Sequence, residues 1–469
     1  MNRLIILLLI AFACGADFDS YFTDRTLRLD YFHSGNATEE RISFDQVRQE
    51  GTWPGSRRIL LDDSDLGKYY FEVIDLTSVT VIYSRGFCSI YGEYETTGEA
   101  LAGNWGTFHE SLRFPEPRDE FIVRLYKRQD NGKFREIWAR RIDPQSYQIN
   151  RAPVLSTGKV WNIISTGGTA DKVDILVMGD GYTKRETVKF KFDAKRLVDA
   201  LFATEPFKSR RSDFNVRGLN ISSPEKGISN PRGRAWKNSA LDLRYNTFDS
   251  DRYVLAYENK LIREISAQAP YDALVILVNS DKYGGGGIFN LYATVAVDTD
   301  PAAYIMIHEF GHSFGGLGDE YYTTDVAYEE FIPAGVEPWD PNVTALLEPG
   351  TVKWGALVAP GTPLPTPWNQ SGYDSARSSY QAARERLVIS GSTSADSMNS
   401  LFAAVRAATE PVLKANQYWG RVGAFEGAGY QEKGLYRPEI DCIMFSRNPD
   451  YFCRVCRAAI ERMIDLHTK

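Results

Sequence analysis

The stretch His308-Glu309-Phe310-Gly311-His312 places two histidines four positions apart, with a glutamate beside the first. Residues i and i+4 share one face of a helix, so both imidazoles can reach one metal ion. Glu309 then lies next to the metal, where a carboxylate can accept a proton from a bound water. This H-E-x-x-H pattern predicts a helix that carries a zinc site, with His308 and His312 as metal ligands and Glu309 as general base.

A third protein ligand is expected directly downstream, in Ser313-Phe314-Gly315-Gly316-Leu317-Gly318-Asp319-Glu320. The glycines should end the helix and turn the chain back toward the ion. We choose Asp319 over Glu320, because a shorter carboxylate suits a chain that already lies close to the metal. Adjacent side chains tend to point apart, so Glu320 should face away from the ion and orient a histidine. The expected cofactor is one Zn²⁺ per chain.

Upstream, residues 26–142 have the pattern of an all-β region. Runs rich in Val, Ile, Tyr and Phe indicate strands at 69–76, 79–84, 121–127 and 134–140. Asn131-Gly132 joins the last two runs, which is a strong hairpin signal. We expect a β-sandwich accessory domain over residues 17–145.

Beyond a polar linker at 146–168, strands and helices alternate, which predicts an α/β catalytic domain over 169–469. Strands are expected at 173–178, 214–222 and 271–278, and helices from about 182 to 202 and over 251–266. Residues 323–421 contain a Pro-rich part and a Gly/Ser/Thr/Ala-rich part, and we expect an irregular insertion there. The fold class is therefore multidomain α+β.

The N-terminus has the pattern of a signal peptide over residues 1–16, with Arg3 before an apolar run and small residues after it. Cleavage after Ala16 is expected and predicts an exported, secreted or periplasmic protein. The alternative is a surface lipoprotein acylated at Cys14. In an oxidising compartment, Cys442 should form a disulfide with Cys453 or Cys456. A redox pair or a three-thiolate zinc site at Cys453 and Cys456 is an alternative, but the sequence shows no fourth ligand nearby.

Composition narrows the classes of partner. The net charge of −7 disfavours nucleic acid and anionic membrane surfaces, both of which require a basic face. After the first twenty residues, no apolar run approaches the roughly 18 residues that a membrane span needs.

Several motifs together resemble a known family. The helix with its glycine turn is similar to the metzincin pattern of zincins, with Gly318 where metzincins have a third histidine. Asp441-Cys442-Ile443-Met444-Phe445-Ser446 resembles the methionine turn beneath their metal, and 283–287 with 293–297 resembles their edge strand. With Gly423–Tyr430 and Gly434–Pro438, the chain resembles the bacterial IgA-peptidase family of zinc metallopeptidases.

That resemblance implies an N-terminal β domain, a metzincin-like catalytic domain and hydrolysis of peptide bonds in protein substrates. Immunoglobulin is suggested as a substrate only by the family name. Candidates for stabilising the oxyanion are Tyr430, Tyr436, Arg437 and Tyr451. The alternative is a surface-binding or adhesive protein with a decayed peptidase domain; the presence of Glu309 argues against it, because binding zinc does not require this residue.

Overall fold

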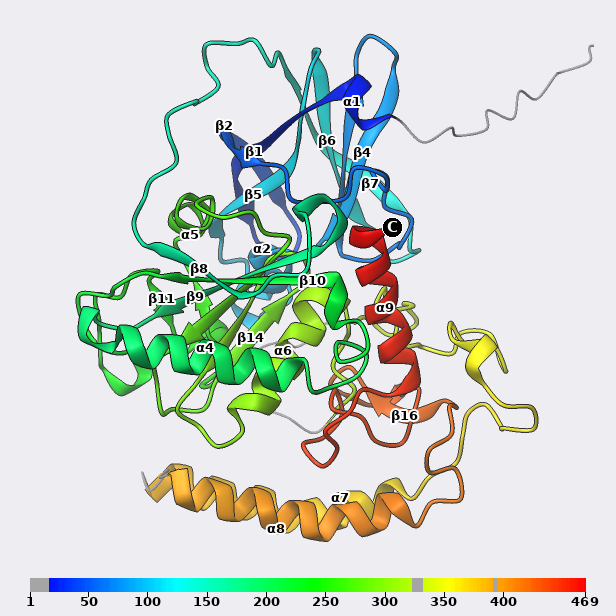
Figure 1. Ribbon diagram of the computed structural model, residues 1–469. Coiled ribbons are helices and arrows are strands. Elements are labelled where there is room, and N and C mark those ends of the chain that lie inside the picture. Colours follow the sequence, from blue (N-terminus) through cyan, green and yellow to red (C-terminus); the bar gives the residue numbers. More distant parts are fainter. Residues whose placement is uncertain (1–16, 323–331, 391–394) are drawn as a thin grey trace, which may run out of the picture.

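The computed structural model describes residues 17–322, 332–390 and 395–469. The expected signal peptide, its cleavage sites and Cys14 lie outside these residues. Figure 1 shows a β-rich N-terminal part next to a mixed α/β part, with helix α9 (Arg454–Thr468) along one side. The β-rich region and the mixed α/β composition agree with the expected fold class.

Two antiparallel sheets form the N-terminal part, in the orders β2-β1-β5 and β4-β3-β6-β7. Alternate side chains of both sheets point inward, and Leu29 and Leu112 of the first sheet share one core with Phe71 and Val123 of the second. The strands are β1 (Phe22–Gly35), β2 (Glu40–Thr52), β3 (Tyr69–Asp75), β4 (Thr80–Phe87), β5 (Gly106–Pro117), β6 (Phe121–Arg128) and β7 (Phe134–Ile142). The four runs recognised in the sequence correspond to β3, β4, β6 and β7, and Asn131-Gly132 connects β6 with its antiparallel partner β7.

The α/β part is built on a six-stranded sheet with the order β14-β15-β13-β9-β10-β8. The four inner strands are parallel, and both edge strands are antiparallel to their neighbours. The strands are β8 (Lys159–Ile164), β9 (Val173–Asp180), β10 (Phe214–Asn220), β13 (Ala273–Val278), β14 (Gly285–Ile288) and β15 (Tyr292–Ala296).

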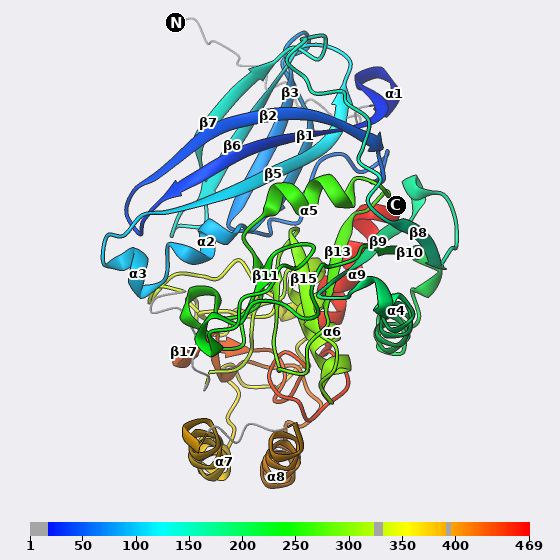
Figure 2. The same ribbon diagram turned by 90° about the vertical axis from the view of Figure 1, so that its left-hand side faces the viewer.

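Both faces of this sheet are covered, which explains why its strands are continuously apolar. Ile175 and Val177 of β9 belong to a core with α4 (Thr187–Leu201), α6 (Ala302–Gly315) and α9. Leu176 and Met178, which point the other way, belong to a second core with α5 (Asn259–Ser266). Figure 2 shows α5 between the sheet and the β-rich part.

Three sequence-based expectations differ from the structure. The stretch expected to be a linker contains β8, which pairs with β10 at the edge of the sheet. The helix expected over 251–266 begins only at Asn259, because Leu255–Ala256 form the short strand β12 with β11 (Leu243–Arg244).

The expectation of an irregular insertion over 323–421 is also wrong for much of its length. Helices α7 (Gln370–Ser390) and α8 (Ala395–Lys414) occupy it and lie side by side (Figures 1 and 2). The sequences of α7 and α8 are rich in alanine, which favours a helix, and in serine, which a helix surface tolerates. Apolar periodicity did not indicate these two helices. The hairpin of β16 (Phe425–Ala428) and β17 (Gln431–Arg437) follows.

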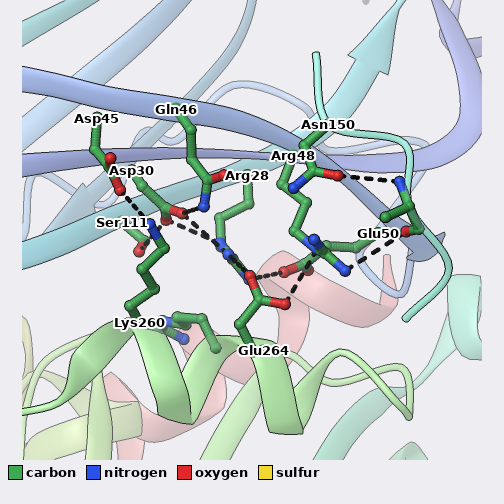
Figure 3. Close-up of polar contacts among 12 residues, drawn as sticks. Arg28, Asp30, Asp45, Gln46, Arg48, Glu50, Ser111, Asn150, Lys260 and Glu264 are labelled. Atoms are coloured by element: carbon green, nitrogen blue, oxygen red, sulfur yellow. Dashed lines mark hydrogen bonds and ion pairs between the residues drawn. The ribbon is translucent and has the colours of Figure 1, made fainter. Parts of the chain in front are cut away.

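A network of buried charges joins the β-rich part to α5 (Figure 3). Arg28, which has no exposed side-chain surface, pairs with Asp30 and Glu50 at 2.8 Å and with Glu264 of α5 at 2.6 Å. Arg48 contacts the other oxygen of Glu264 at 3.2 Å. Because the cation lies among three carboxylates, it compensates charges from both parts of the chain.

Replacing Arg28 by alanine should leave Asp30 buried without its ion pair and remove one of the two cations that contact Glu50 and Glu264, which keep Arg113 and Arg48. We expect Arg28→Ala to lower the free energy of unfolding by about 3–5 kcal/mol, measured by denaturant unfolding of the purified protein. The matched control is Arg25→Ala, which removes an arginine whose side chain is 53% exposed and lies 4.0 Å from Asp24. That variant should change stability by less than about 0.5 kcal/mol; equal effects of the two variants would show that the network does not contribute.

Candidate metal centre

Helix α6 carries the H-E-x-x-H residues along the sheet. Its buried face, including Ile305, Met306 and Phe310, packs in the main core of the α/β part. The helix ends at Gly315, and Gly316 adopts a left-handed conformation with φ 63°. The glycine stop predicted from the sequence is therefore present, and the chain turns back directly after it.

This turn brings Asp319 to the two histidines. Asp319 Oδ1 lies 3.1 Å from His308 Nε2 and 3.3 Å from His312 Nε2. The two Nε2 atoms are 3.1 Å apart. Ligands of a tetrahedral ion with bonds of about 2.0–2.1 Å lie about 3.3 Å from one another. The structure thus brings the three predicted ligands together at the spacing of a metal site.

The hydrogen bonds of the two rings determine which nitrogen faces the centre. His308 Nδ1 lies 3.1 Å from the carbonyl of Ile443, and His312 Nδ1 lies 2.6 Å from the carbonyl of Leu317. A carbonyl only accepts hydrogen bonds, so each Nδ1 carries a proton and each neutral ring presents an unprotonated Nε2. Asp319 Oδ1 is buried and has no hydrogen-bond partner. Three acceptors therefore face one another, an arrangement that a cation stabilises.

The pKa shifts of these side chains without a metal also indicate that the cluster needs a positive charge. Burial lowers the pKa of His312, but the Asp319 carboxylate outweighs burial and raises this pKa to about 10. Burial raises the pKa of Asp319, but the two histidines lower it well below its usual value. Without a metal, these shifts favour a protonated His312 beside an ionised Asp319. A metal ion therefore competes with this proton for the position between the side chains.

Glu309 lies beside this cluster under the glycine-rich edge strand β14. A Cβ added to Gly285 would lie 3.1 Å from Glu309 Oε1, and one added to Gly287 would lie 2.4 Å from the Glu309 carbonyl oxygen. Burial raises the pKa of Glu309, and the charges of His308 and His312 oppose the rise. Glycines in β14 are therefore required for the strand to approach the helix so closely.

The turn at residues 441–446 lies under the same helix. Met444 is fully buried, and a Cβ added to Gly311 would lie 3.1 Å from its sulfur. The neighbouring Ile443 supplies the carbonyl that orients His308. The Met444 backbone carbonyl also accepts a hydrogen bond from Glu320 N at 3.0 Å. This turn thus positions two segments of the site at once.

Aromatic residues surround the cluster, and the sequence did not single out two of them. Tyr304, one turn before His308, has its hydroxyl 3.3 Å from His308 Nδ1, and its spacing of four residues was the available signal. The ring of Tyr321 stacks on His308 with centroids 6.3 Å apart. The Tyr430 hydroxyl, one of the proposed oxyanion donors, instead donates to Asp319 Oδ2 at 2.5 Å. These contacts orient the ligands.

A basic residue that the sequence did not reveal is Arg252. Burial lowers the pKa of Arg252, but Tyr321, Tyr283 and Asp319 together raise it above its usual value, and the charge of Arg252 in turn lowers the pKa of Glu309. Arg252 thus adds a positive charge to a site that already contains two carboxylates.

Other proposed residues lie elsewhere. Tyr436 is 3.5 Å from Glu426, and Arg437 donates to the carbonyls of Glu426, Gly427 and Ile440. Tyr451 is 39% exposed, and its backbone carbonyl bonds to Ile443 N.

Glu320 faces away from the histidines, as expected. Its expected role of orienting one of them is wrong, since backbone carbonyls do so. Its Oε1 accepts a hydrogen bond from Asn342 at 2.9 Å. The predicted disulfide is absent as well: Cys442, Cys453 and Cys456 are free thiols.

Residues 161–464 match the protein family described as IgA Peptidase M64, and residues 17–139 match Peptidase M64 N-terminus. Because the first match spans well over half of the chain, this protein belongs to the IgA Peptidase M64 family. A search of curated proteins finds no match. None of the helices in the described part of the chain combines the length and apolarity that a membrane crossing requires.

The close approach of β14 to α6 can be tested at Gly287. A Cβ at this position meets the Glu309 carbonyl at 2.4 Å and His312 Cβ at 2.9 Å, so Gly287→Ala must displace the strand or the helix. We expect a loss of about 1–3 kcal/mol in the free energy of unfolding and weaker zinc binding, measured by denaturation and by competition with a chelator. Gly168→Ala, where an added Cβ meets nothing within 4 Å, is the control and should leave both unchanged.

Proposed function

We propose that this peptidase is an exported, zinc-dependent endopeptidase of the metzincin-like type. The observation that carries the proposal is the convergence of His308 Nε2, His312 Nε2 and Asp319 Oδ1 within 3.3 Å of one another, with His308 and Asp319 buried and His312 partly exposed. Two imidazoles and one carboxylate are the donor set of a catalytic zinc, which keeps a further position open. When bound, zinc acts as a Lewis acid and lowers the pKa of a coordinated water.

The protein side chains supply the remaining chemistry. His308, His312 and Asp319 hold the ion, and Glu309, on the same helix, accepts a proton from the attacking water. Glu309 then donates that proton to the nitrogen of the leaving amine, which prevents recombination. Burial raises the pKa of Glu309 in the metal-free site, in the direction that favours accepting a proton. Tyr430 holds Asp319 by its second oxygen, leaving Oδ1 for the ion.

The substrate is a protein or peptide, and export rests on the N-terminal pattern of residues 1–16. The charge of −7 makes nucleic acid an unfavourable partner.

The proposed function is tested first at Glu309. Glu309→Gln should bind zinc and unfold like the wild type but hydrolyse an unfolded protein substrate at least about 10²–10⁴-fold more slowly, because the proton acceptor is lost. Zinc content by elemental analysis and cleavage assays with and without a chelator measure both effects. Wild-type turnover in the variant would remove Glu309 from the mechanism.

The metal ligands are tested by affinity rather than by activity. Tyr430→Phe, which removes the hydrogen bond to Asp319, should weaken zinc binding about 10–100-fold. Asp319→Ala, which removes a ligand, should weaken it more. The control is Tyr436→Phe, whose hydroxyl lies near Glu426 and outside the centre. Unchanged affinity in Asp319→Ala would contradict the assignment of the third ligand.

A further inference from the structure

A second cluster of side chains that can bind a metal lies next to the histidine centre. The carboxylate of Glu320 and the sulfurs of Cys442, Cys453 and Cys456 all lie within 4.8 Å of one another. All four residues are at most 1% exposed. In the sequence, Glu320 lies 133 positions from Cys453 and 136 from Cys456, which explains why no fourth ligand was evident near the cysteines.

The backbone around the cysteines donates hydrogen bonds to sulfur. Cys453 N points to Cys442 Sγ at 3.2 Å, and Cys456 N points to Cys453 Sγ at 3.4 Å. Cys453 is the N-cap of α9, a helix of 15 residues, so the positive end of the helix dipole lies at the cluster. Amide donors and a helix N-terminus both favour thiolate over thiol.

A disulfide does not account for this arrangement. One bridge would use two of the sulfurs and leave the third sulfur and the carboxylate in the same dry pocket. Glu320 Oε2 is buried and has no hydrogen-bond partner, although Asn342 binds Oε1 at 2.9 Å. Burying such a group without a partner is costly, and a cation satisfies all four side chains together.

We propose that Glu320, Cys442, Cys453 and Cys456 bind a second, structural zinc ion. The distance from Cys442 Sγ to Cys456 Sγ is 3.8 Å. Two thiolates that bind one tetrahedral zinc with bonds of about 2.3 Å lie about 3.8 Å apart. Glu320 Oε1 lies 3.1 Å from Cys456 Sγ and 4.0 Å from Cys453 Sγ, on either side of the roughly 3.5 Å expected for one oxygen and one sulfur ligand.

The donor set selects the ion. Three thiolates exclude Mg²⁺ and Ca²⁺, which prefer oxygen, and a carboxylate is a poor ligand for Cu(I). Ligand atoms all within 4.8 Å leave room for one ion rather than for an iron–sulfur cluster. Four protein ligands also close the coordination shell, as in structural rather than catalytic zinc sites.

The surrounding charges fit a site that carries excess negative charge. Arg437 is fully buried, donates to three backbone carbonyls and interacts electrostatically with Glu320. With the amides on sulfur and the start of α9, it offsets the negative charge that three thiolates and a carboxylate retain around a divalent ion.

The two centres share two short segments of chain. Asp319 belongs to the first centre and Glu320 to the second, and Cys442 of the second precedes Ile443, whose carbonyl orients His308. A metal ion in the cysteine cluster therefore fixes the backbone that presents Asp319 and the Ile443 carbonyl. The second centre acts as a support for the first.

Metal content with the first centre removed tests this inference. The double variant His308→Ala/His312→Ala should retain one zinc per chain after dialysis against a weak chelator, whereas the wild type retains two. X-ray absorption of the zinc in the double variant should show sulfur neighbours at about 2.3 Å. The cobalt-substituted variant should show sulfur-to-metal charge-transfer absorption. A double variant without bound metal would overturn the proposal.

Two further measurements keep the outcome separate from folding and from the first centre. X-ray absorption of the wild type needs no substitution, and a zinc spectrum with nitrogen and oxygen neighbours alone would overturn the second site. Mass mapping that finds a bridge from Cys442 to Cys456 would do the same. A single zinc with sulfur neighbours in both proteins would support the second site while contradicting the first.

The matched cysteine variants are Cys456→Ser and Cys88→Ser. The first should lose the sulfur-bound zinc and bind zinc at the histidine centre more weakly, because Glu320 and the turn at Cys442 lose their anchor. The second removes the described cysteine outside the cluster and should retain both ions. Loss of the sulfur-bound zinc from both Cys456→Ser and Cys88→Ser would overturn the assignment of the cysteine cluster as its site.

Discussion

The constraint on which this structure depends is that two imidazole nitrogens and one carboxylate oxygen face one another and need a positive charge between them, a proton or a metal ion. Two backbone carbonyls, of Leu317 and Ile443, hold the Nδ1 protons of the histidines and so turn their other nitrogens inward. Tyr430 holds one oxygen of Asp319 and leaves the other unpartnered. A fold that holds these acceptor atoms so close together needs a positive charge between them. The packing around α6 keeps the atoms in this arrangement.

That packing is unusually close on two sides of α6. The glycines of β14 bring a strand onto the helix backbone, and Gly311 admits Met444 beneath it. Interiors packed at this density transmit displacements rather than absorb them, so small changes in the strand or the turn reach the ligands. The buried charges around Arg28 extend the same rigidity to the β-rich part, because Glu264 belongs to the α/β part.

The parts of the site that could be predicted from the sequence are those whose residues lie close together along the chain. The ligands His308 and His312 and the base Glu309 lie within one helical turn, and the glycines that deliver Asp319 follow directly, so local rules of spacing were sufficient. Tyr430 and the Ile443 carbonyl come from segments more than one hundred residues away; family resemblance pointed to both segments, but no local pattern assigned their contacts with Asp319 and His308. Apolar runs located β9, β10 and β13 of the sheet, but the sequence analysis did not identify α7 and α8, because their Pro-, Gly- and Ser-rich surroundings indicated an irregular segment.

The separation of 135 positions between His308 and Ile443 also determines when the centre can form. A chain is synthesised from its N-terminus, so the helix with both histidines is complete long before the carbonyl that orients one of them. Until the last few dozen residues are available, the nascent chain contains the reactive residues without their arrangement. Sequence order alone thus delays completion of this centre until the segment around Ile443 has been synthesised.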